Sequence, residues 1–377
     1  MTRFRIPCNW DPGLLDALDE FPRERIADIF GMVPSHVAGG GRPAAAMPKV
    51  SMEDARRYIA DATSRGYVFN YLFNAPCLDA REFTDAWRTS FLEHLDWAVE
   101  SGARAVTIAV PYLIEVVKQR YPDIHISVSS YARVAAPHRA AYFKALGADE
   151  IIVDPTTGNR DFEALAAMAR SVDCTITVIA NGICLSQCPF AEYHGVLMGH
   201  SSQDGHPSGG KYDEYPYYSC TVRKLTSPAA LIGSVFVRPE DIAFYESLGV
   251  TSFKLVDRMR PTEWLAASLR AYVDGTYDGD LLQIVNFPHG FLSFLWKSAG
   301  MEGTPVFPRV DNRKLDGLIE RIRDANCRTA SCETCGVCQE FAEKAVENPE
   351  GVGRLAGLLA GMKGRLMFGA RQAANTD

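Results

Sequence analysis

The chain has 377 residues, of which 47% are hydrophobic and 23% are charged, and its formal net charge at pH 7 is -7. This length and composition allow a large buried core, arranged as two or three domains or as one barrel with an appendage. The acidic balance does not support nucleic-acid binding, which needs a basic surface to displace counterions. No stretch approaches the roughly 20 apolar residues that cross a bilayer, and residues 1–10 contain no apolar run typical of a secretory signal. We therefore expect a cytoplasmic protein without membrane association.

Short apolar or β-branched runs alternate with helix-like segments along most of the chain. Strict alternation predicts a parallel sheet, and eight such units predict closure as a (β/α)8 TIM-type barrel, with an open doubly wound sheet as the alternative. We place the barrel at residues 1–290 and a small cysteine-bearing extension at residues 291–377. The predicted strands are residues 4–9, 67–75, 105–110, 125–134, 150–154, 175–181, 234–238 and 252–258. The predicted helices are residues 51–65, 82–101, 112–121, 137–146, 161–171, 239–248 and 261–274.

Polar side chains alternate along several of these strands. Lys254 and Arg258 share one face of the last strand, whose other face is apolar and should pack on helices. The same parity places Asn70 and Ser127 inside the barrel. Polar groups there need partners, so we expect either a buried hydrogen-bond network or a substrate. Arg238, at the end of the predicted seventh strand, would add a third cation at the rim, suited to an anionic substrate or cluster; ordinary ion pairing is the alternative.

A long connection, residues 182–233, follows the predicted sixth strand and holds Cys184, Cys188 and Cys220. Connections of this length in a compact domain are usually functional. Because the C-terminal ends of barrel strands meet at one rim, Cys77 and Cys8, at the ends of two other strands, are candidates for a fourth thiolate. We prefer Cys77, since the preceding proline marks a clear strand end. The alternative is that both are small buried hydrophobic residues.

A second set of cysteines lies near the C-terminus, with the spacing Cys327-x4-Cys332-x2-Cys335-x2-Cys338. Thiolates this close together can reach one ion or cluster, and structural disulfides are rare in reducing compartments. Zinc folds usually present two Cys-x2-Cys pairs that are a dozen or more residues apart. The compact spacing therefore favours an iron-sulfur cluster. A zinc ion and unligated or redox-active thiols are the alternatives.

Two histidines of the long connection, His194 and His200, are candidate general acids or bases, because the ordinary pKa of histidine suits neutral pH. They lie six residues apart, so they would not share a helix face but could both reach the mouth from a loop. The alternative is that each simply hydrogen-bonds a carbonyl.

The cysteine stretch at residues 179–194 resembles the collagenase-like peptidase family U32, and it reads IANGICLSQCPFAEYH. The resemblance continues in VRPED at residues 237–241, FKLVDR at residues 253–258 and RPTEW at residues 260–264. The segments GGGRP (residues 39–43) and NYLFN (residues 70–74) fit its divergent branch. The resemblance implies an N-terminal barrel. Some members look like iron-sulfur proteins of oxygen-independent hydroxylation, acting on ubiquinone precursors or RNA bases, and others are peptidases.

The residues and the resemblance together predict an iron-sulfur redox enzyme with one or two 4Fe-4S clusters. The rim cluster would be held by Cys184, Cys188, Cys220 and Cys77, and the C-terminal set would relay electrons or hold the tail in place. A small anionic or biosynthetic substrate would be held by Arg238, Lys254 and Arg258. An electron donor or partner subunit is also expected. A peptidase is the runner-up, although no His-Glu-x-x-His or Gly-x-Ser-x-Gly motif is present, and a non-catalytic partner subunit is a further alternative.

Overall fold

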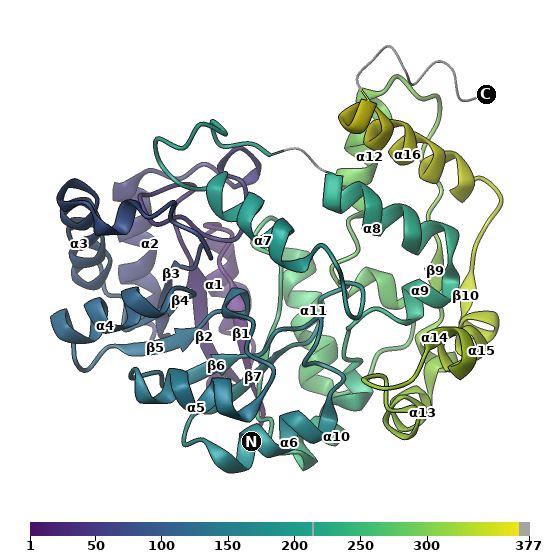
Figure 1. Cartoon of the computed structure of the whole chain (residues 1–377), viewed down its shortest axis with the longest axis horizontal. Helices are drawn as coiled ribbons and strands as arrows, with labels where there is room; N and C mark the ends of the chain where they lie inside the picture. The colour runs from purple at the N-terminus through teal and green to yellow at the C-terminus, as the bar shows by residue number, and fades with distance from the viewer. Residues whose placement is uncertain (213–214, 369–377) are drawn as a thin grey trace.

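A closed barrel of eight parallel strands forms the core of the protein, in the order β1 to β8 (Figure 1). The structure is a computed structural model and describes residues 1–212 and 215–368. The predicted (β/α)8 fold class is confirmed. The strands are β1 (Arg3–Pro7), β2 (Ile26–Gly31), β3 (Phe69–Phe73), β4 (Ala105–Ile108), β5 (His125–Val128), β6 (Glu150–Ile152), β7 (Thr175–Ile179) and β8 (Ser252–Lys254).

Helices surround the barrel, and most of the predicted helices are present within a few residues of their expected bounds. Those of the barrel region are α1 (Gly13–Leu18), α2 (Met52–Ser64), α3 (Asp85–Glu100), α4 (Pro111–Arg120), α5 (Pro137–Ala145), α6 (Phe162–Ser171), α7 (Ala191–His200), α8 (Tyr215–Thr226), α9 (Pro228–Ile232), α10 (Ile242–Ser247) and α11 (Thr262–Asp274). The later ones are α12 (His289–Ser298), α13 (Leu318–Ala325), α14 (Cys332–Cys335), α15 (Val337–Ala345) and α16 (Val352–Phe368), beside a short two-stranded sheet of β9 (Arg309–Val310) and β10 (Val346–Glu347).

The barrel closes between its first and last strands. β1 and β8 pair in parallel, with Arg3 beside Ser252 and Phe4 beside Phe253. The rings of Phe4 and Phe253 lie 6.2 Å apart, and Tyr272 of α11 packs on Phe4 at 6.2 Å. Burying one such ring contributes about 1.5–3 kcal/mol, so aromatic packing adds to the backbone hydrogen bonds that close the barrel.

A cluster of charged and polar side chains fills the barrel interior. Arg5 of β1 is 1% exposed and forms ion pairs with Asp28 of β2 and Glu150 of β6. The Ser127 hydroxyl accepts a hydrogen bond from Arg5 Nη2 at 3.0 Å and donates one to Glu150 Oε2 at 2.7 Å. Asn70 Nδ2 donates to Asp28 Oδ2 at 2.9 Å. The interior positions predicted for Asn70 and Ser127 are therefore observed, and the network pairs the polar groups that the barrel buries.

The strand β2 was missed by the sequence analysis. Ile26, Ile29 and Phe30 have the i, i+3, i+4 spacing of an apolar helix face, although they lie on a strand. All three are buried, because a barrel strand has helices on one side and the packed interior on the other. With both faces buried, the strand shows no alternation of apolar and polar residues by which it could be recognised.

The predicted strand at residues 234–238 was wrong. β7 pairs directly with β8, with Thr177 beside Ser252. Residues 234–238 instead run in extended conformation beside the chain that leaves β7. Val235 N donates to Cys184 O at 2.9 Å, and Val237 N donates to Ala180 O at 2.8 Å. The segment is β-branched and buried, as a strand would be, but it lies outside the barrel.

The long connection at residues 182–233 is not structureless, since it contains α7, α8 and α9. Two of these helices pack on the C-terminal part of the chain, α8 against α16 and α9 against α15 (Figure 1). The predicted extension at residues 291–377 includes residues 369–377, which lie outside the described residues, and its boundary at residue 290 stays a prediction. In residues 1–212 and 215–368, no helix has both the length and the apolar character that a membrane span requires.

The interior ion pairs generate a prediction about stability. Burial by itself would raise the pKa of Glu150, but the Arg5 guanidinium lowers that pKa to about 2. An unfolded glutamate titrates near 4.3, so this stabilisation is present above about pH 4.5 and is lost as the pH falls towards 2. Arg5→Met leaves two carboxylates buried without their cation and should lower the free energy of unfolding at pH 7 by about 3–5 kcal/mol.

Urea denaturation of the two proteins at several pH values measures this difference. The loss should shrink as the pH falls towards 2. Arg57→Met is the matched control, because Arg57 forms its ion pairs on the exposed surface of α2 and should have little effect. Equal effects of the two substitutions would contradict the role assigned to Arg5.

Candidate metal and substrate site at the barrel mouth

The chain that leaves β7 is fixed at the barrel mouth by Asn181, which is fully buried. Its side chain bonds both backbone groups of Val256, just after β8: Nδ2 donates to the carbonyl at 2.6 Å and Oδ1 accepts from the amide at 2.7 Å. Its carbonyl accepts from Asn286 N at 2.8 Å. This clamp determines where Cys184, three residues later, emerges from the barrel.

α8 brings a second part of the connection to the same place. Cys220 and Lys224 lie four residues apart and therefore on one face of α8. Lys224 is 5% exposed, and its Nζ donates to the carbonyl of Ile183 at 3.1 Å. Because Ile183 directly precedes Cys184, this hydrogen bond holds the Cys220 face of α8 against the chain that carries Cys184.

The three thiols of this region form one electrostatic group. Burial raises the pKa of Cys184 to about 11, and the neighbouring Cys220 and Cys188 raise it further, while Lys224 opposes them. Cys184 is nevertheless open to solvent, and Cys188 and Cys220 are half-buried. The pKa of Cys188 is raised by burial and by Cys220. The three residues are therefore close enough to act on one another electrostatically. Among the described residues, however, the group whose ligand atoms all lie within 4.8 Å of one another is Cys77, Asp79 and His200, and not these thiols.

Cationic side chains border the thiol group. Lys224 and Arg42 both act on Cys184, and Arg133 acts on Cys188. Arg42 is held by Asp257, to which its Nε donates at 2.8 Å, and Arg133 by Asp154 at 3.2 Å. Sequence analysis did not select these three residues. The GGGRP segment is the one signal that pointed to Arg42, whereas Lys224 and Arg133 reach the site only through the fold.

His194 of α7 belongs to this group as well. Its Nε2 lies 3.4 Å from the Tyr212 hydroxyl. Burial, together with repulsion from Arg42, Lys224 and Arg133, lowers the pKa of His194 to about 4. At neutral pH the imidazole is therefore uncharged, and its pKa lies below the near-neutral value from which the acid/base role was predicted.

Arg258 and Lys254 lie in the interior of the mouth, as the strand parity predicted. Arg258 is 5% exposed, and among residues 1–212 and 215–368 its Nη1 has no hydrogen-bond partner. Lys254 Nζ lies 3.7 Å from the centre of the Phe30 ring, at a cation–π distance. Burial lowers the pKa of Lys254 to about 7, and Arg5 and Arg258 lower it further, against Asp28 and Glu150.

Three residues selected from the sequence lie elsewhere. Arg238 does not join Lys254 and Arg258, because it is bonded to the C-terminal part of the chain: its Nε donates to Asn312 at 2.9 Å and its Nη2 to Asp316 at 2.6 Å. Cys77 and His200 form a separate group with Asp79. That group lies at the far end of α7 from Cys188, and a helix of 10 residues is about 15 Å long. The structure therefore does not place Cys77 with the three mouth thiols.

The C-terminal cysteines act on one another electrostatically. Burial raises the pKa values of Cys327 and Cys338, and in both cases the neighbouring cysteines of the set raise them further while Arg160 lowers them. The Cys338 sulfur lies against Gly233, and Val235 N donates to the Cys184 carbonyl at 2.9 Å. Residues 233–235 therefore lie between the two cysteine groups.

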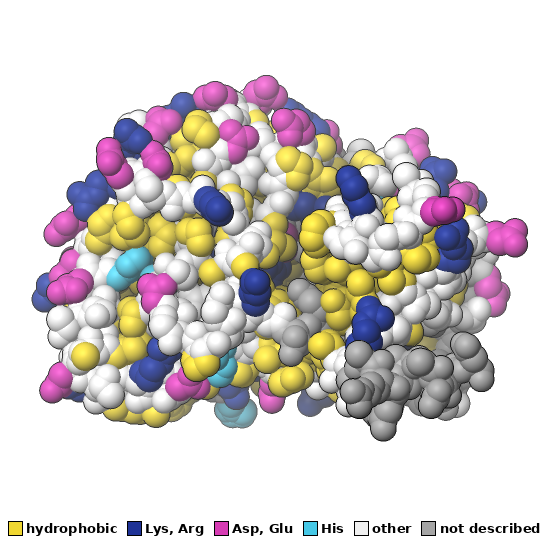
Figure 2. Space-filling model, turned by 90° about the horizontal axis from the view of Figure 1, so that it is seen from above, with side chains coloured by type: hydrophobic (Ala, Val, Ile, Leu, Met, Phe, Trp, Pro, Cys, Tyr) yellow, Lys and Arg dark blue, Asp and Glu magenta, His cyan; other side chains and the backbone are white. Residues whose placement is uncertain are grey.

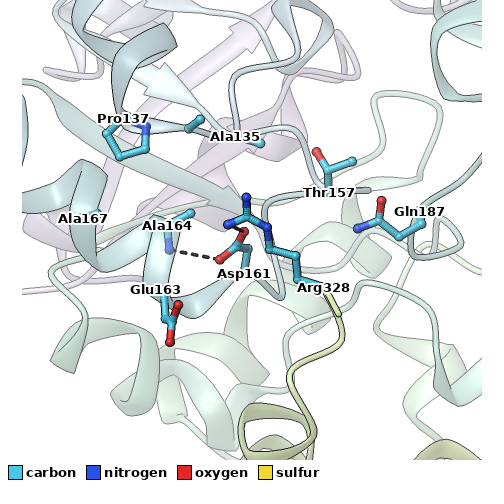
Figure 3. Close-up of a pocket in the computed structure, with 10 residues that line it drawn as sticks. Ala135, Pro137, Thr157, Asp161, Glu163, Ala164, Ala167, Gln187 and Arg328 are labelled. Atoms are coloured by element: carbon cyan, nitrogen blue, oxygen red, sulfur yellow. Dashed lines mark hydrogen bonds and ion pairs between the residues drawn. The ribbon is translucent and has the colours of Figure 1, made fainter. Parts of the chain in front are cut away.

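A cavity of about 510 Å³ lies outside the barrel, between the starts of α5 and α6 (Figure 3). Arg328 crosses it to reach Asp161, with 3.4 Å between Nη1 and Oδ2. Among the described residues that line it there is no thiol or histidine. The residues that line it are Ala135, Ala136, Pro137, Thr157, Asp161, Glu163, Ala164, Ala167, Gln187 and Arg328.

Charges on the surface also bear on the type of partner. Figure 2 shows acidic and basic side chains interspersed over the face that it draws. Recognition of a nucleic-acid backbone uses clustered basic residues along one face or helix. The distribution on this face gives no support to such a partner.

No family model matches the sequence. The chain is 26% identical over 324 residues to the uncharacterized protease MJ1657 of Methanocaldococcus jannaschii, a match that covers 85% of this chain and 89% of that protein. The solved structure of the U32 peptidase Mk0906 is similar, with 24% identity, a TM-score of 0.49 and coverage of 68% of this chain and 93% of that one. The name of the relative from Methanocaldococcus jannaschii, a protease, is in keeping with the resemblance of the sequence to a peptidase family.

Lys254 generates a prediction about pH dependence. Its pKa is about 7 in the folded protein and near 10.4 when unfolded, so burying the charged form costs stability. The cost is fully present below about pH 7 and disappears as the pH rises towards 10. Lys254→Met should therefore stabilise the protein by roughly 4–5 kcal/mol at pH 6 and by much less at pH 10.

Urea denaturation at pH 6, 8 and 10 checks this expectation. Lys297→Met is the control, because Lys297 lies exposed on α12 and should give no pH-dependent difference. A Lys254→Met effect that does not change with pH would contradict the burial of a charged amine in the mouth.

Proposed function

We propose that this chain is an iron-sulfur redox enzyme, related to the U32 peptidases, that modifies a small anionic substrate at its barrel mouth. The proposal depends on one observation: Cys220 of α8 acts electrostatically on Cys184 and Cys188, which are far from it in the sequence, and several cationic side chains lie beside these thiols. Iron-sulfur clusters are held by cysteine thiolates, and a cluster with thiolate ligands carries negative charge. Nearby cations would stabilise that charge.

The cations around the mouth thiols favour an anionic iron-sulfur cluster, although three cysteines with His194 would also make a Cys3His zinc set. Structural zinc sites are closed by four protein ligands, usually cysteine and histidine. Among the described residues, three cysteines gather at the mouth, which leaves one coordination position for another ligand. When bound, a cluster on Cys184, Cys188 and Cys220 supplies one-electron chemistry.

The residues around the thiols can bind and orient a substrate. Arg258 Nη1 is buried without a hydrogen-bond partner among the described residues, which is costly unless a ligand supplies an acceptor. A carboxylate or phosphate oxygen is such an acceptor, and Arg42 lies close enough to influence the pKa of Arg258. His194, uncharged at neutral pH, can take up a proton there. These features support an anionic substrate. With the family resemblance, they support a hydroxylation independent of O2, in which water would supply the oxygen atom and the two electrons removed from the substrate would pass to an electron-transfer protein.

The C-terminal cysteines fit a second centre that exchanges electrons with the first. Cys338 lies against Gly233, while Cys184 is bonded to Val235, so a path of three residues separates the two groups. We propose that Cys327, Cys332, Cys335 and Cys338 hold a second iron-sulfur cluster. An electron-transfer protein or partner subunit would dock near this set, and zinc at this position is the alternative.

A peptidase is the second candidate function, and the name of the similar protein from Methanocaldococcus jannaschii favours it. A cysteine peptidase needs a thiolate beside a protonated imidazole, with the pKa of the cysteine lowered. Here the pKa of Cys184 is raised to about 11 and that of His194 is lowered to about 4. Both shifts oppose a thiolate–imidazolium pair in the metal-free chain.

Iron and sulfide content tests the redox proposal. After anaerobic reconstitution, the full chain should contain about eight iron and eight sulfide ions, with the electron paramagnetic resonance of 4Fe-4S clusters after reduction. Cys184→Ser, Cys188→Ser and Cys220→Ser should each lower the iron content to about four. Cys335→Ser should also lower the iron content to about four, because it removes the C-terminal cluster.

Cys174→Ser is the matched control, because Cys174 is half-buried and its thiol donates to the Ala148 carbonyl at 3.3 Å, outside both groups. Its iron content should equal that of the unchanged chain. Bound zinc at both cysteine groups, without iron or visible absorption, would reject the redox proposal.

A protease assay on the metal-free protein distinguishes the two functions. The metal-free chain should cleave neither casein nor gelatin, because the Cys184 thiol stays protonated at neutral pH. Cleavage by the metal-free protein that is lost in Cys184→Ala and kept in Cys174→Ala would establish the peptidase instead.

A further inference from the structure

The loop after β3 and the end of α7 bring together side chains of the kinds that bind metal ions. Cys77 and Asp79 lie in the loop, and His200 is the last residue of α7. One ligand atom from each of them lies within 4.8 Å of the other two. The sequence suggested different roles for Cys77 and His200 and did not select Asp79.

The distances agree with tetrahedral coordination. The Cys77 sulfur lies 3.8 Å from Asp79 Oδ1, which lies 3.2 Å from His200 Nε2. With zinc bond lengths of about 2.3 Å to sulfur and about 2.1 Å to nitrogen or oxygen, a tetrahedral site separates sulfur from oxygen by about 3.6 Å and oxygen from nitrogen by about 3.4 Å. The two observed distances therefore differ from those of a zinc site by a few tenths of an ångström.

His200 has a buried ring nitrogen to which no described residue forms a hydrogen bond. Its Nε2 is buried and has no hydrogen-bond partner among the described residues, although Asp79 Oδ1 is close by. A buried polar atom without a partner is costly, and a metal ion is one of the groups that can satisfy it. The nitrogen that lacks a partner is the same one that faces Cys77 and Asp79.

Surrounding residues orient the three ligands. Ser208 N donates to His206 Nδ1 at 3.1 Å, so the proton of a neutral His206 lies on Nε2, 3.4 Å from Asp79 Oδ2. This arrangement occupies one oxygen of Asp79 and leaves Oδ1 for an ion. The rings of His200 and His206 stack with 4.4 Å between their centres. Such contacts from outside the ligand set are typical of histidine and carboxylate metal sites.

The loop itself is held in place beside α7. Gln203 Nε2 donates to the Cys77 carbonyl at 2.7 Å. Asp79 and Ala80 both have φ near +57°, a left-handed conformation that costs energy for residues with a side chain. The backbone therefore keeps the Asp79 carboxylate turned towards His200 at a conformational cost.

We propose that Cys77, Asp79 and His200 bind one zinc-class divalent ion, at a site separate from the mouth thiols and the C-terminal cysteines. One thiolate, one imidazole and one carboxylate suit zinc, and three protein ligands leave a fourth position for water or another small ligand. The ion would also link the loop after β3 to the end of α7, the helix whose other half carries His194. This inference does not depend on the iron-sulfur proposal.

Zinc binding by the full chain tests this inference. Cys77→Ser, Asp79→Asn and His200→Gln should each lose one equivalent of tightly bound zinc per chain after dialysis against a weak chelator. His138→Gln is the control, because His138 is an exposed histidine on α5 and its change should leave zinc content the same. X-ray absorption of the zinc that these variants lose should show one sulfur ligand, with nitrogen and oxygen for the rest.

The zinc content of Cys184→Ser distinguishes this site from the mouth thiols. That variant should lose iron and keep the zinc equivalent that His200→Gln removes. Circular dichroism checks that each variant is folded, and Asp79→Asn and His200→Gln decide the result if Cys77→Ser is unstable. Zinc content in both of these variants equal to that of His138→Gln would overturn the inference.

Discussion

The buried charge cluster of Arg5, Asp28 and Glu150 is the constraint on which the rest of the barrel depends. These residues come from β1, β2 and β6, and none of the three side chains has an exposed fraction above 7%. Isolated charges in such an interior would cost several kcal/mol each, so the cluster is stable only when all three strands are in place. Lys254 lies beside the same cluster. Burial is the main cause of its lowered pKa, Arg5 lowers that pKa further, and Asp28 and Glu150 oppose the shift.

The position of α7 divides the rim into two chemically different regions. One end of the helix lies at Cys188, beside the thiols and cations of the mouth, and the other end carries His200, beside Cys77 and Asp79. The first region has sulfur ligands and positive charge, which suit an anionic cluster and substrate. The second has one thiol, one carboxylate and one imidazole, which suit a single divalent ion. One short helix therefore positions candidate ligands for both proposed metal centres.

Sequence patterns predicted the features that depend on local spacing. Strand parity placed Asn70 and Ser127 inside the barrel, and both are bonded there. The same reasoning failed at β2, because a strand buried on both faces loses its alternating pattern. It also failed at residues 234–238, where a β-branched, buried segment lies beside the chain after β7 instead of within the barrel. Both segments are buried, and a buried segment is apolar whether or not its backbone pairs within the barrel. Apolar composition therefore did not distinguish a barrel strand from a buried segment outside the barrel.

The sequence by itself determined the barrel class, the two cysteine groups and the inward direction of Lys254 and Arg258, because each follows from the order or spacing of residues along one segment. Only the tertiary structure decided which segments meet. It placed Cys77 with Asp79 and His200, Arg238 with Asn312, and Arg42 beside the mouth thiols. Those contacts join residues far apart in the chain, and they depend on how helices and loops pack around the closed barrel, which no local pattern records.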